Sequence, residues 1–253
     1  MPESFSPRSY AEGVLVVCGR ELEAYFDSPI AYICATVFLI LSGTTFMNSF
    51  FLAGVVDMSP YFEVLPFLLI PFIPALSMRT WAEERAQHTF ELLMTLPLDA
   101  SQLVLGKYLA ALGFYLIVLA GSLPIVAMLC WLGDPDLGLI IANYLGAGAL
   151  GAFFLAFGVF VSCLTRNQIV AFVLAALIGF FFVFSGHEQV VEVLDGLSPA
   201  WQVGTWLSES VSVLPHYQAF GRGVVALADG LYFLLMSGFF LWANDLVLRR
   251  SKL

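Results

Sequence analysis

The sequence predicts an all-α integral membrane protein with six transmembrane helices, and three observations support this. Of the 253 residues, 60% are hydrophobic and 11% are charged, whereas about half and about a quarter are usual in soluble domains. A helix needs about 20 residues of low charge to cross the hydrocarbon core of a membrane. The long apolar runs do not alternate apolar and polar residues as transmembrane β-strands do. The six runs are residues 30–53, 60–78, 106–132, 137–164, 168–185 and 229–247.

Lysine and arginine residues predict the orientation, because they collect in the cytoplasmic loops of membrane proteins. They precede the first run, lie between the second and third and between the fourth and fifth, and follow the sixth. We therefore expect both termini in the cytoplasm and an acidic outer surface. The formal net charge of -9 gives no indication of nucleic-acid binding, which requires a basic surface.

The cysteines predict neither a disulfide framework nor a metal site. They have no Cys-x-x-Cys spacing, and no two of them are expected on the outer side. We interpret all four as small apolar residues of the interior. They are Cys18, Cys34, Cys130 and Cys163. The first 29 residues are too charged for a cleavable signal peptide.

Residues 12–29 predict an amphipathic helix that lies in the membrane plane, an elbow before the first span. Ser28-Pro29 ends this helix, and Pro29 suits the first turn of the next one. We therefore divide the chain into a cytoplasmic N-terminal region, residues 1–29, and a transmembrane domain, residues 30–253. The apolar residues at helical spacing are Val14, Cys18, Leu22, Tyr25 and Phe26, and the candidate functional residues are Arg20, Glu21, Tyr25 and Phe26.

The segment 79–98 is the one dense polar stretch between apolar runs, and it has two interpretations. Most charge runs are solvated loops. Here the charged half is followed by an apolar tail that ends before Pro97. The tail favours an amphipathic segment at the membrane surface that a partner can push, within a coupling loop of residues 79–105. Its candidate contact residues are Arg79, Glu83, Glu84, Arg85, His88, Thr89, Glu91 and Leu92.

The first, second and fourth spans contain polar residues, prolines and glycines, respectively, that affect the shape or packing of a helix. Residues 42–48 form a polar patch in the first span, for which helix packing is favoured over a substrate path. Three prolines predict a kink in the second span. Four glycines in the fourth span favour close helix approach, either within the chain or between two copies. The prolines are Pro66, Pro71 and Pro74, and the glycines are Gly146, Gly148, Gly151 and Gly158.

Residues 186–228 are too polar for a full span, yet they contain several aromatic residues. We expect short re-entrant helices that form an outer hairpin and close the protein on that side, with the tryptophans at headgroup level. Arg222 is the lone outer cation and is expected to pair with Asp229 or Glu209. The alternative is that Arg222 extends to lipid phosphates. The candidate residues of this outer gate are Trp201, Trp206, His216, Tyr217 and Arg222.

The sequence lacks the motifs by which a transporter hydrolyses nucleotide or couples transport to an ion gradient. It has no Gly-x-x-x-x-Gly-Lys-Ser/Thr loop for nucleotide phosphates and no His-Glu-x-x-His pair, and its three histidines lie on different loops. Ionisable residues, which ion-coupled carriers need at depth, are nearly absent from the first, third, fourth and fifth spans. Energy for transport must therefore come from another protein.

Several short motifs are distributed along most of the chain. They are Arg20-Glu21-Leu22, Tyr25-Phe26, Ser28-Pro29, Ala82-Glu83-Glu84-Arg85, Thr89, Glu91-Leu92-Leu93, Thr95, Pro97, Leu105-Gly106-Lys107, Leu164-Thr165-Arg166-Asn167-Gln168, His216-Tyr217, Phe220 and Arg222-Gly223-Val224. Together they resemble the permease subunit of an ABC-2 type transporter, and most closely the branch of gliding-motility-associated permeases. The resemblance extends from about residue 12 to residue 250. His88 departs from it, because the family usually has glycine at that position.

The resemblance implies partners and a location. The loop after the second span would form a coupling helix that docks into a groove of a separate cytoplasmic ABC ATPase. Two permease subunits, identical or related, and two ATPases would make the working unit in a bacterial inner membrane. ATP and magnesium would bind to the ATPase, and this chain would bind no cofactor. A periplasmic or membrane accessory protein is a further candidate partner, and we expect the permease faces to involve the first and fifth spans.

Three functions compete at this stage. The first is a permease that exports or extracts a substrate. The second is a membrane anchor whose ATPase does mechanical or assembly work without moving a solute. The third, a membrane enzyme such as a lipid-modifying protein, is disfavoured by the lack of clustered polar residues.

Overall fold

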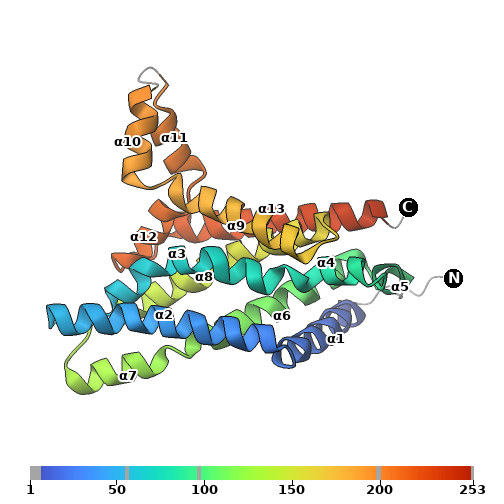
Figure 1. The fold of residues 1–253 in the computed structure, drawn as a ribbon, viewed down its shortest axis with the longest axis horizontal. Helices are drawn as coiled ribbons and strands as arrows, with labels where there is room; N and C mark the ends of the chain where they lie inside the picture. The colour runs from blue at the N-terminus through green and yellow to red at the C-terminus, as the bar shows by residue number, and fades with distance from the viewer. Residues whose placement is uncertain (1–6, 55–56, 96–97, 198–200, 252–253) are drawn as a thin grey trace.

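The computed structural model describes residues 7–54, 57–95, 98–197 and 201–251, and within these ranges it contains helices and no strand. Figure 1 shows the long helices side by side as a bundle. The first residues of α1 and the last of α13 lie at one end, which we call the termini end. The helices are α1 (Pro7–Phe26), α2 (Pro29–Ala53), α3 (Ser59–Ser77), α4 (Arg79–Ala86), α5 (Phe90–Thr95), α6 (Ala100–Ala120), α7 (Leu123–Leu132), α8 (Leu137–Leu164), α9 (Gln168–Phe184), α10 (Glu188–Leu197), α11 (Val203–Ser210), α12 (Leu214–Gly221) and α13 (Leu227–Ser251).

The core forms around α8, which packs against α3, α6, α9, α12 and α13. Within its apolar window, 72% of the residues are buried, compared with 22% for α2 and for α13. Aromatic rings fill the space around it: the centroid of Phe153 lies 5.0 Å from that of Phe182 in α9 and 6.1 Å from that of Phe240 in α13. The outer helices keep their apolar side chains exposed, as contact with lipid requires.

Three glycines permit the close packing of α8, because a Cβ at each would collide with a side chain of the same protein. The neighbours come from three different helices, α12, α6 and α3. For these glycines the within-chain interpretation is therefore the correct one. The pairs are Gly146 with Phe220, Gly151 with Tyr115, and Gly158 with Ser77.

The prediction of several apolar spans is confirmed. Five segments of the described chain are long and apolar enough to cross a membrane, and there are six if α9 and α10 form one broken span. α9 has only 17 residues, and α10 leaves it at an angle of 80°. The three prolines of α3 all lie inside a helix that continues through them.

The third predicted span differs from expectation at both ends. Its helix α6 begins at Ala100, six residues earlier than predicted, because Asp99 and Gln102 form a capping box that satisfies its first amide groups. It ends at Ala120, and α7 begins at Leu123 with a proline in its first turn. The outer part of this span is therefore a separate helix.

The outer segment folds as two parts, so the expectation of one covered structure is wrong for the first part. α10 and α11 pack on each other and project from the bundle (Figure 1), and no residue of α10 is buried. Asp195 joins them, because its Oδ1 accepts a hydrogen bond from the amide of Gly204 at 2.7 Å. α12 instead packs on α3, α8 and α13. The hydroxyl of Tyr217 donates to the carbonyl of Phe62 at 2.9 Å.

Candidate functional site

The site begins where α1 lies unusually close to α6. A Cβ on Gly106 of α6 would lie 2.6 Å from Cβ of Val17 in α1, so only glycine fits there without displacement. Gly13 makes a similar approach to Gln102, whose amide donates to the carbonyl of Tyr10 at 3.2 Å. The residue that follows Gly106 is thereby held inside the contact between the two helices.

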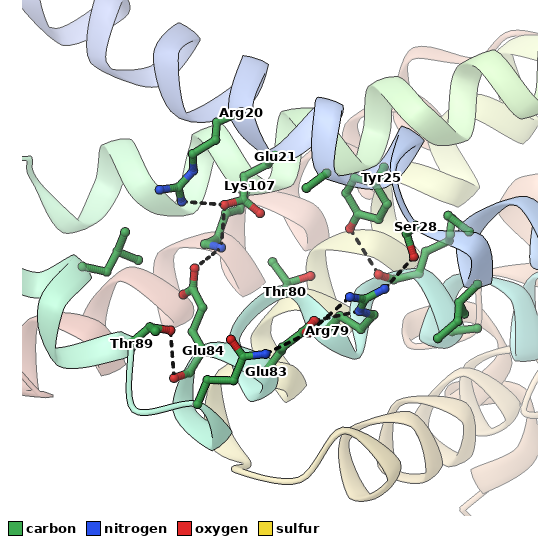
Figure 2. A pocket seen from close by; sticks show the side chains of 17 residues that line it. Arg20, Glu21, Tyr25, Ser28, Arg79, Thr80, Glu83, Glu84, Thr89 and Lys107 are labelled. Atoms are coloured by element: carbon green, nitrogen blue, oxygen red, sulfur yellow. Dashed lines mark hydrogen bonds and ion pairs between the residues drawn. The ribbon is translucent and has the colours of Figure 1, made fainter.

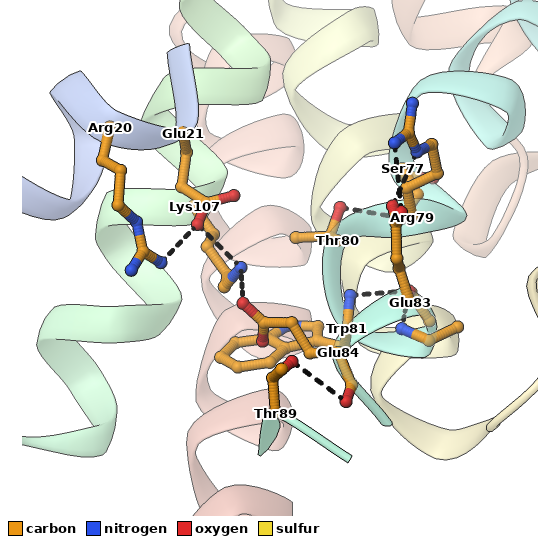
Figure 3. A network of polar contacts seen from close by, with 12 residues as sticks. Arg20, Glu21, Ser77, Arg79, Thr80, Trp81, Glu83, Glu84, Thr89 and Lys107 are labelled. Atoms are coloured by element: carbon orange, nitrogen blue, oxygen red, sulfur yellow. Dashed lines mark hydrogen bonds and ion pairs between the residues drawn. The ribbon is translucent and has the colours of Figure 1, made fainter. Parts of the chain in front are cut away.

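That residue is Lys107, and its side chain is only 1% exposed. Its Nζ lies 3.0 Å from Glu21 Oε1 of α1, 2.8 Å from Glu84 Oε1 of α4 and 5.0 Å from the ring centre of Trp81 (Figure 3). A buried charge is tolerated only when it is paired in this way. Burial raises the pKa of Glu21, but Lys107 and Arg20 outweigh burial and leave this pKa below its ordinary value. One ammonium group therefore joins α1, α4 and α6.

Ser162 of α8 holds the first turn of α4. Its Oγ accepts hydrogen bonds from the amides of Trp81 at 3.1 Å and Ala82 at 3.2 Å, and it donates to the carbonyl of Met78 at 2.9 Å. The first amides of a helix have no partner within the helix, and here α8 supplies one. Trp81 and Ala82 are fully buried. The inner face of α4 is therefore fixed to the bundle.

Arg79 joins the start of α4 to the junction of α1 and α2. Its Nε lies 2.7 Å from Glu83 Oε2, and its guanidinium also donates to Ser28, the residue that precedes α2. Nearby, the hydroxyl of Tyr25 donates to the carbonyl of Leu76 at 3.1 Å. The junction between α1 and α2, predicted at Ser28-Pro29, is thus attached to both α3 and α4.

A tight turn joins α4 to α5. His88 has a φ of +59°, in the left-handed region that glycine adopts at least cost. This is the position at which the motif expects glycine. The amide of Thr89 donates to the carbonyl of Glu84 at 3.0 Å and closes the turn. Gln87, His88 and Thr89 are exposed.

A cavity of about 600 Å³ lies between the junction of α1 and α2 on one side and α3 and α4 on the other. Figure 2 shows charged side chains on two flanks of it: Arg20, Glu21, Lys107 and Glu84 on one, and Arg79 and Glu83 on the other. Ile30, Ala31, Ala75 and Leu76 provide an apolar part of its lining.

The structure separates the predicted coupling residues into three groups by their exposure. Glu84 and Arg85 turn toward the bundle, where Arg85 lies 4.6 Å from the ring centre of Phe90 and 3.8 Å from Sγ of Cys163. Arg79 and Glu83 pair with each other at half-exposed positions. The exposed group consists of His88, Thr89 and Glu91. Leu92 belongs to α5, but its side chain is outside the part that the structure describes, as is Pro97.

The predicted elbow residues belong to the same network. Arg20 pairs with Glu21 at 2.8 Å. The rings of Tyr25 and Phe26 lie 5.3 Å and 5.6 Å from that of Phe114 in α6. The helix is longer than expected, since it begins at Pro7 and not near residue 12.

Sequence reasoning gave no role to Lys107, Trp81 or Ser162. A signal existed for Lys107, because a lysine at the start of an apolar run is costly unless it has a partner. No local signal identifies Ser162, which is one of several small residues in α8.

The residues of the predicted outer gate do not form one group. Trp201 and Trp206 lie on or beside the projecting hairpin and are 83% and 61% exposed. The predicted pairing of Arg222 is wrong within the described residues: Arg222 is exposed, and Asp229 lies 2.7 Å from His216 Nδ1 instead. His216 also stacks on Tyr232 of α13, with ring centres 4.0 Å apart. The histidine is the better partner because α12 carries it directly to the start of α13.

The cysteines are all free, and they differ in burial: Cys163 is buried, Cys18 and Cys34 are half-buried, and Cys130 is exposed. The interior interpretation is therefore wrong for Cys130. Across the described ranges, no three His, Cys, Asp or Glu residues lie together as a metal site would require.

Comparison with known families decides the identity of this bundle. The model of the ABC-2 family transporter protein matches residues 18–204, from the middle of α1 to the start of α11. The chain belongs to the ABC-2 transporter family. It is therefore a multi-pass membrane protein of the permease type. The second half of α1, all of α4 and Lys107 lie inside the matched region. A search of curated proteins gave no match.

Proposed function

We propose that this permease works with a separate cytoplasmic ABC ATPase, two copies of which drive two permease subunits to export or extract a substrate. ATP and magnesium would bind to the ATPase and not to this chain. The termini end would face the cytoplasm of a bacterial inner membrane, and α9 with α10 would supply the fifth of the six predicted spans. The gliding-motility branch rests on the sequence motifs alone.

One observation supports the ATPase contact above all. The segment from α4 to α5 is fixed to the bundle on its inner side by Ser162 and Lys107, whereas Gln87, His88 and Thr89 are exposed at its turn. A partner that moves this turn would move α1 and α6 as well, because the same ammonium group binds all three helices. This arrangement fits a coupling helix.

Exposed polar residues on α2 support the proposal of a second permease subunit. Thr44 and Asn48 are exposed on the outer half of this apolar helix. A polar amide in contact with lipid has no hydrogen-bond partner, which is costly. α2 and α9 both pack on α3, and we propose that their exposed faces meet the second subunit, identical or related.

The test is to purify the tagged permease from its native membranes and to identify an ABC ATPase among the bound proteins by its nucleotide-binding motif. We expect Glu91→Arg to weaken the complex about tenfold or more, since Glu91 is exposed beside the turn. Glu209→Arg, on the projecting hairpin, is the matched control. If no ATPase binds, or if both variants weaken the complex equally, the proposed contact is wrong.

A second measurement separates transport from mechanical anchoring. The complex is reconstituted in vesicles, and movement of labelled lipids or peptides is followed during ATP hydrolysis. ATP turnover without movement of any tested solute would favour the anchor.

A further inference from the structure

The cavity between α1, α2, α3 and α4 contains an unsatisfied acceptor. Glu84 lines it, and its Oε1 binds Lys107 at 2.8 Å. Its Oε2 is buried and has no hydrogen-bond partner in the described part of the chain. A buried carboxylate oxygen without a donor is costly, so a ligand that donates an N–H there would be stabilised.

The charges around the cavity balance. Three cationic and three acidic side chains line it, namely Arg20, Arg79, Lys107, Glu21, Glu83 and Glu84. Arg79 has five N–H donors, and its three hydrogen bonds to described residues leave two of these donors without a partner there. A balanced lining with a free acceptor and a free guanidinium edge suits a zwitterion better than a polyanion.

The apolar side of the cavity and its place in the fold indicate where such a ligand comes from. Ile30 and Ala31 belong to the first turn of α2, and Ala75 and Leu76 to the last turn of α3. Both helices belong to segments long and apolar enough to cross a membrane. A ligand with its polar part among the charges would have an apolar part directed along these helices.

We propose that this cavity binds the headgroup of an aminophospholipid from the leaflet at the termini end. On binding, the Glu84 side chain turns its buried Oε2 toward the cavity, where it accepts from the primary ammonium, and the phosphate accepts from Arg79. The choline headgroup has no N–H and cannot satisfy Glu84, and a glycerol headgroup brings no positive charge to it. The site does not depend on the proposed ATPase.

The experiment measures lipids retained by the purified full-length protein in native mass spectrometry. Phosphatidylethanolamine, phosphatidylcholine and phosphatidylglycerol with identical acyl chains are supplied at equal concentration. We expect phosphatidylethanolamine to be retained about tenfold more than the other two, as a charge-assisted hydrogen bond implies. Equal retention of the three lipids would overturn the proposal.

Two variants locate the binding. Glu84→Gln should remove the preference for phosphatidylethanolamine, and Glu23→Gln, an exposed change in α1, should not. Glu84→Gln also weakens the pair with Lys107, so a second variant leaves all the charges in place. Ala24→Phe should fill the cavity from an exposed lining position and reduce retention about tenfold, whereas Ala11→Phe, exposed but outside the lining, should not.

Soluble phosphoethanolamine distinguishes the source of the headgroup. If it fails to displace the lipid even in large excess, the membrane supplies the ligand, as proposed. Displacement at the concentration of the lipid itself would show a site for a soluble metabolite and overturn the assignment. Retention unchanged in both Glu84→Gln and Ala24→Phe would exclude the cavity.

Discussion

The two ends of the molecule differ in the burial and pairing of a cationic side chain. At the termini end, Lys107 is 1% exposed, and carboxylates from two other helices surround it. At the end with the projecting hairpin, Arg222 is exposed and has no carboxylate partner within the described residues. The difference follows from burial, because a desolvated ammonium must be paired while water solvates an exposed guanidinium. At the termini end, close pairing of buried charges therefore fixes the helices to one another.

The largest expected effect comes from removing the central ammonium. Lys107→Ala leaves Glu84 without its ion-pair partner and Glu21 with only the exposed Arg20, and we expect a loss of about 3 to 5 kcal/mol in stability. Thermal or denaturant unfolding of the purified protein measures this. Arg20→Ala, which removes a cation that is 56% exposed, is the control and should have a much smaller effect. Equal losses would show that burial does not distinguish the two cations.

The close contact that buries Lys107 is the next target. Gly106→Val places a side chain against Val17 and should separate α1 from α6, at a cost of about 1 to 3 kcal/mol. Gly19→Val is the matched control in α1, because no atom lies within 4 Å of its Cβ position. An unchanged unfolding midpoint for Gly106→Val would mean that the helices are not held as close as described.

At the end with the projecting hairpin, we expect His216 and not Arg222 to hold α12 against α13. His216→Ala removes the partner of Asp229 and should cost about 1 to 2 kcal/mol. It should also speed the labelling of a cysteine placed at Val213, which is buried. Arg222→Ala should change neither measurement. Faster labelling in Arg222→Ala alone would restore the expectation that this arginine closes the outer side.

The smallest expected effect is at the turn between α4 and α5. His88→Gly relieves the positive φ and should stabilise the protein by up to about 1 kcal/mol. Gln87→Gly, at a φ of -87°, has no such strain to relieve and should not stabilise it. A loss of stability in His88→Gly would show that the histidine side chain has a role of its own.

Much of the fold follows from local properties of the sequence. Apolar runs and their charged ends predicted the long helices, and Ser28-Pro29 marked the break between α1 and α2. The glycines of α8 predicted close packing, which the structure confirms within the chain. His88 adopts the left-handed conformation although it is not glycine, so the residue type alone did not determine this turn. The break after α6 and the projection of α10 and α11 were not foreseen, because packing decides them.

The partners of the polar residues depended on the tertiary structure. Lys107 is 86 residues from Glu21 and 23 from Glu84, and Ser162 is 81 residues from Trp81. Composition showed that these groups were costly in an apolar chain, but it did not show which of them would meet. The crossing of α1 over α6 at Gly106 and the contact of α4 with α8 determine which polar groups meet. The sequence by itself determined which segments form long apolar helices, because hydropathy and helix-breaking residues act locally. Only the packing of those helices decided which charges are buried together.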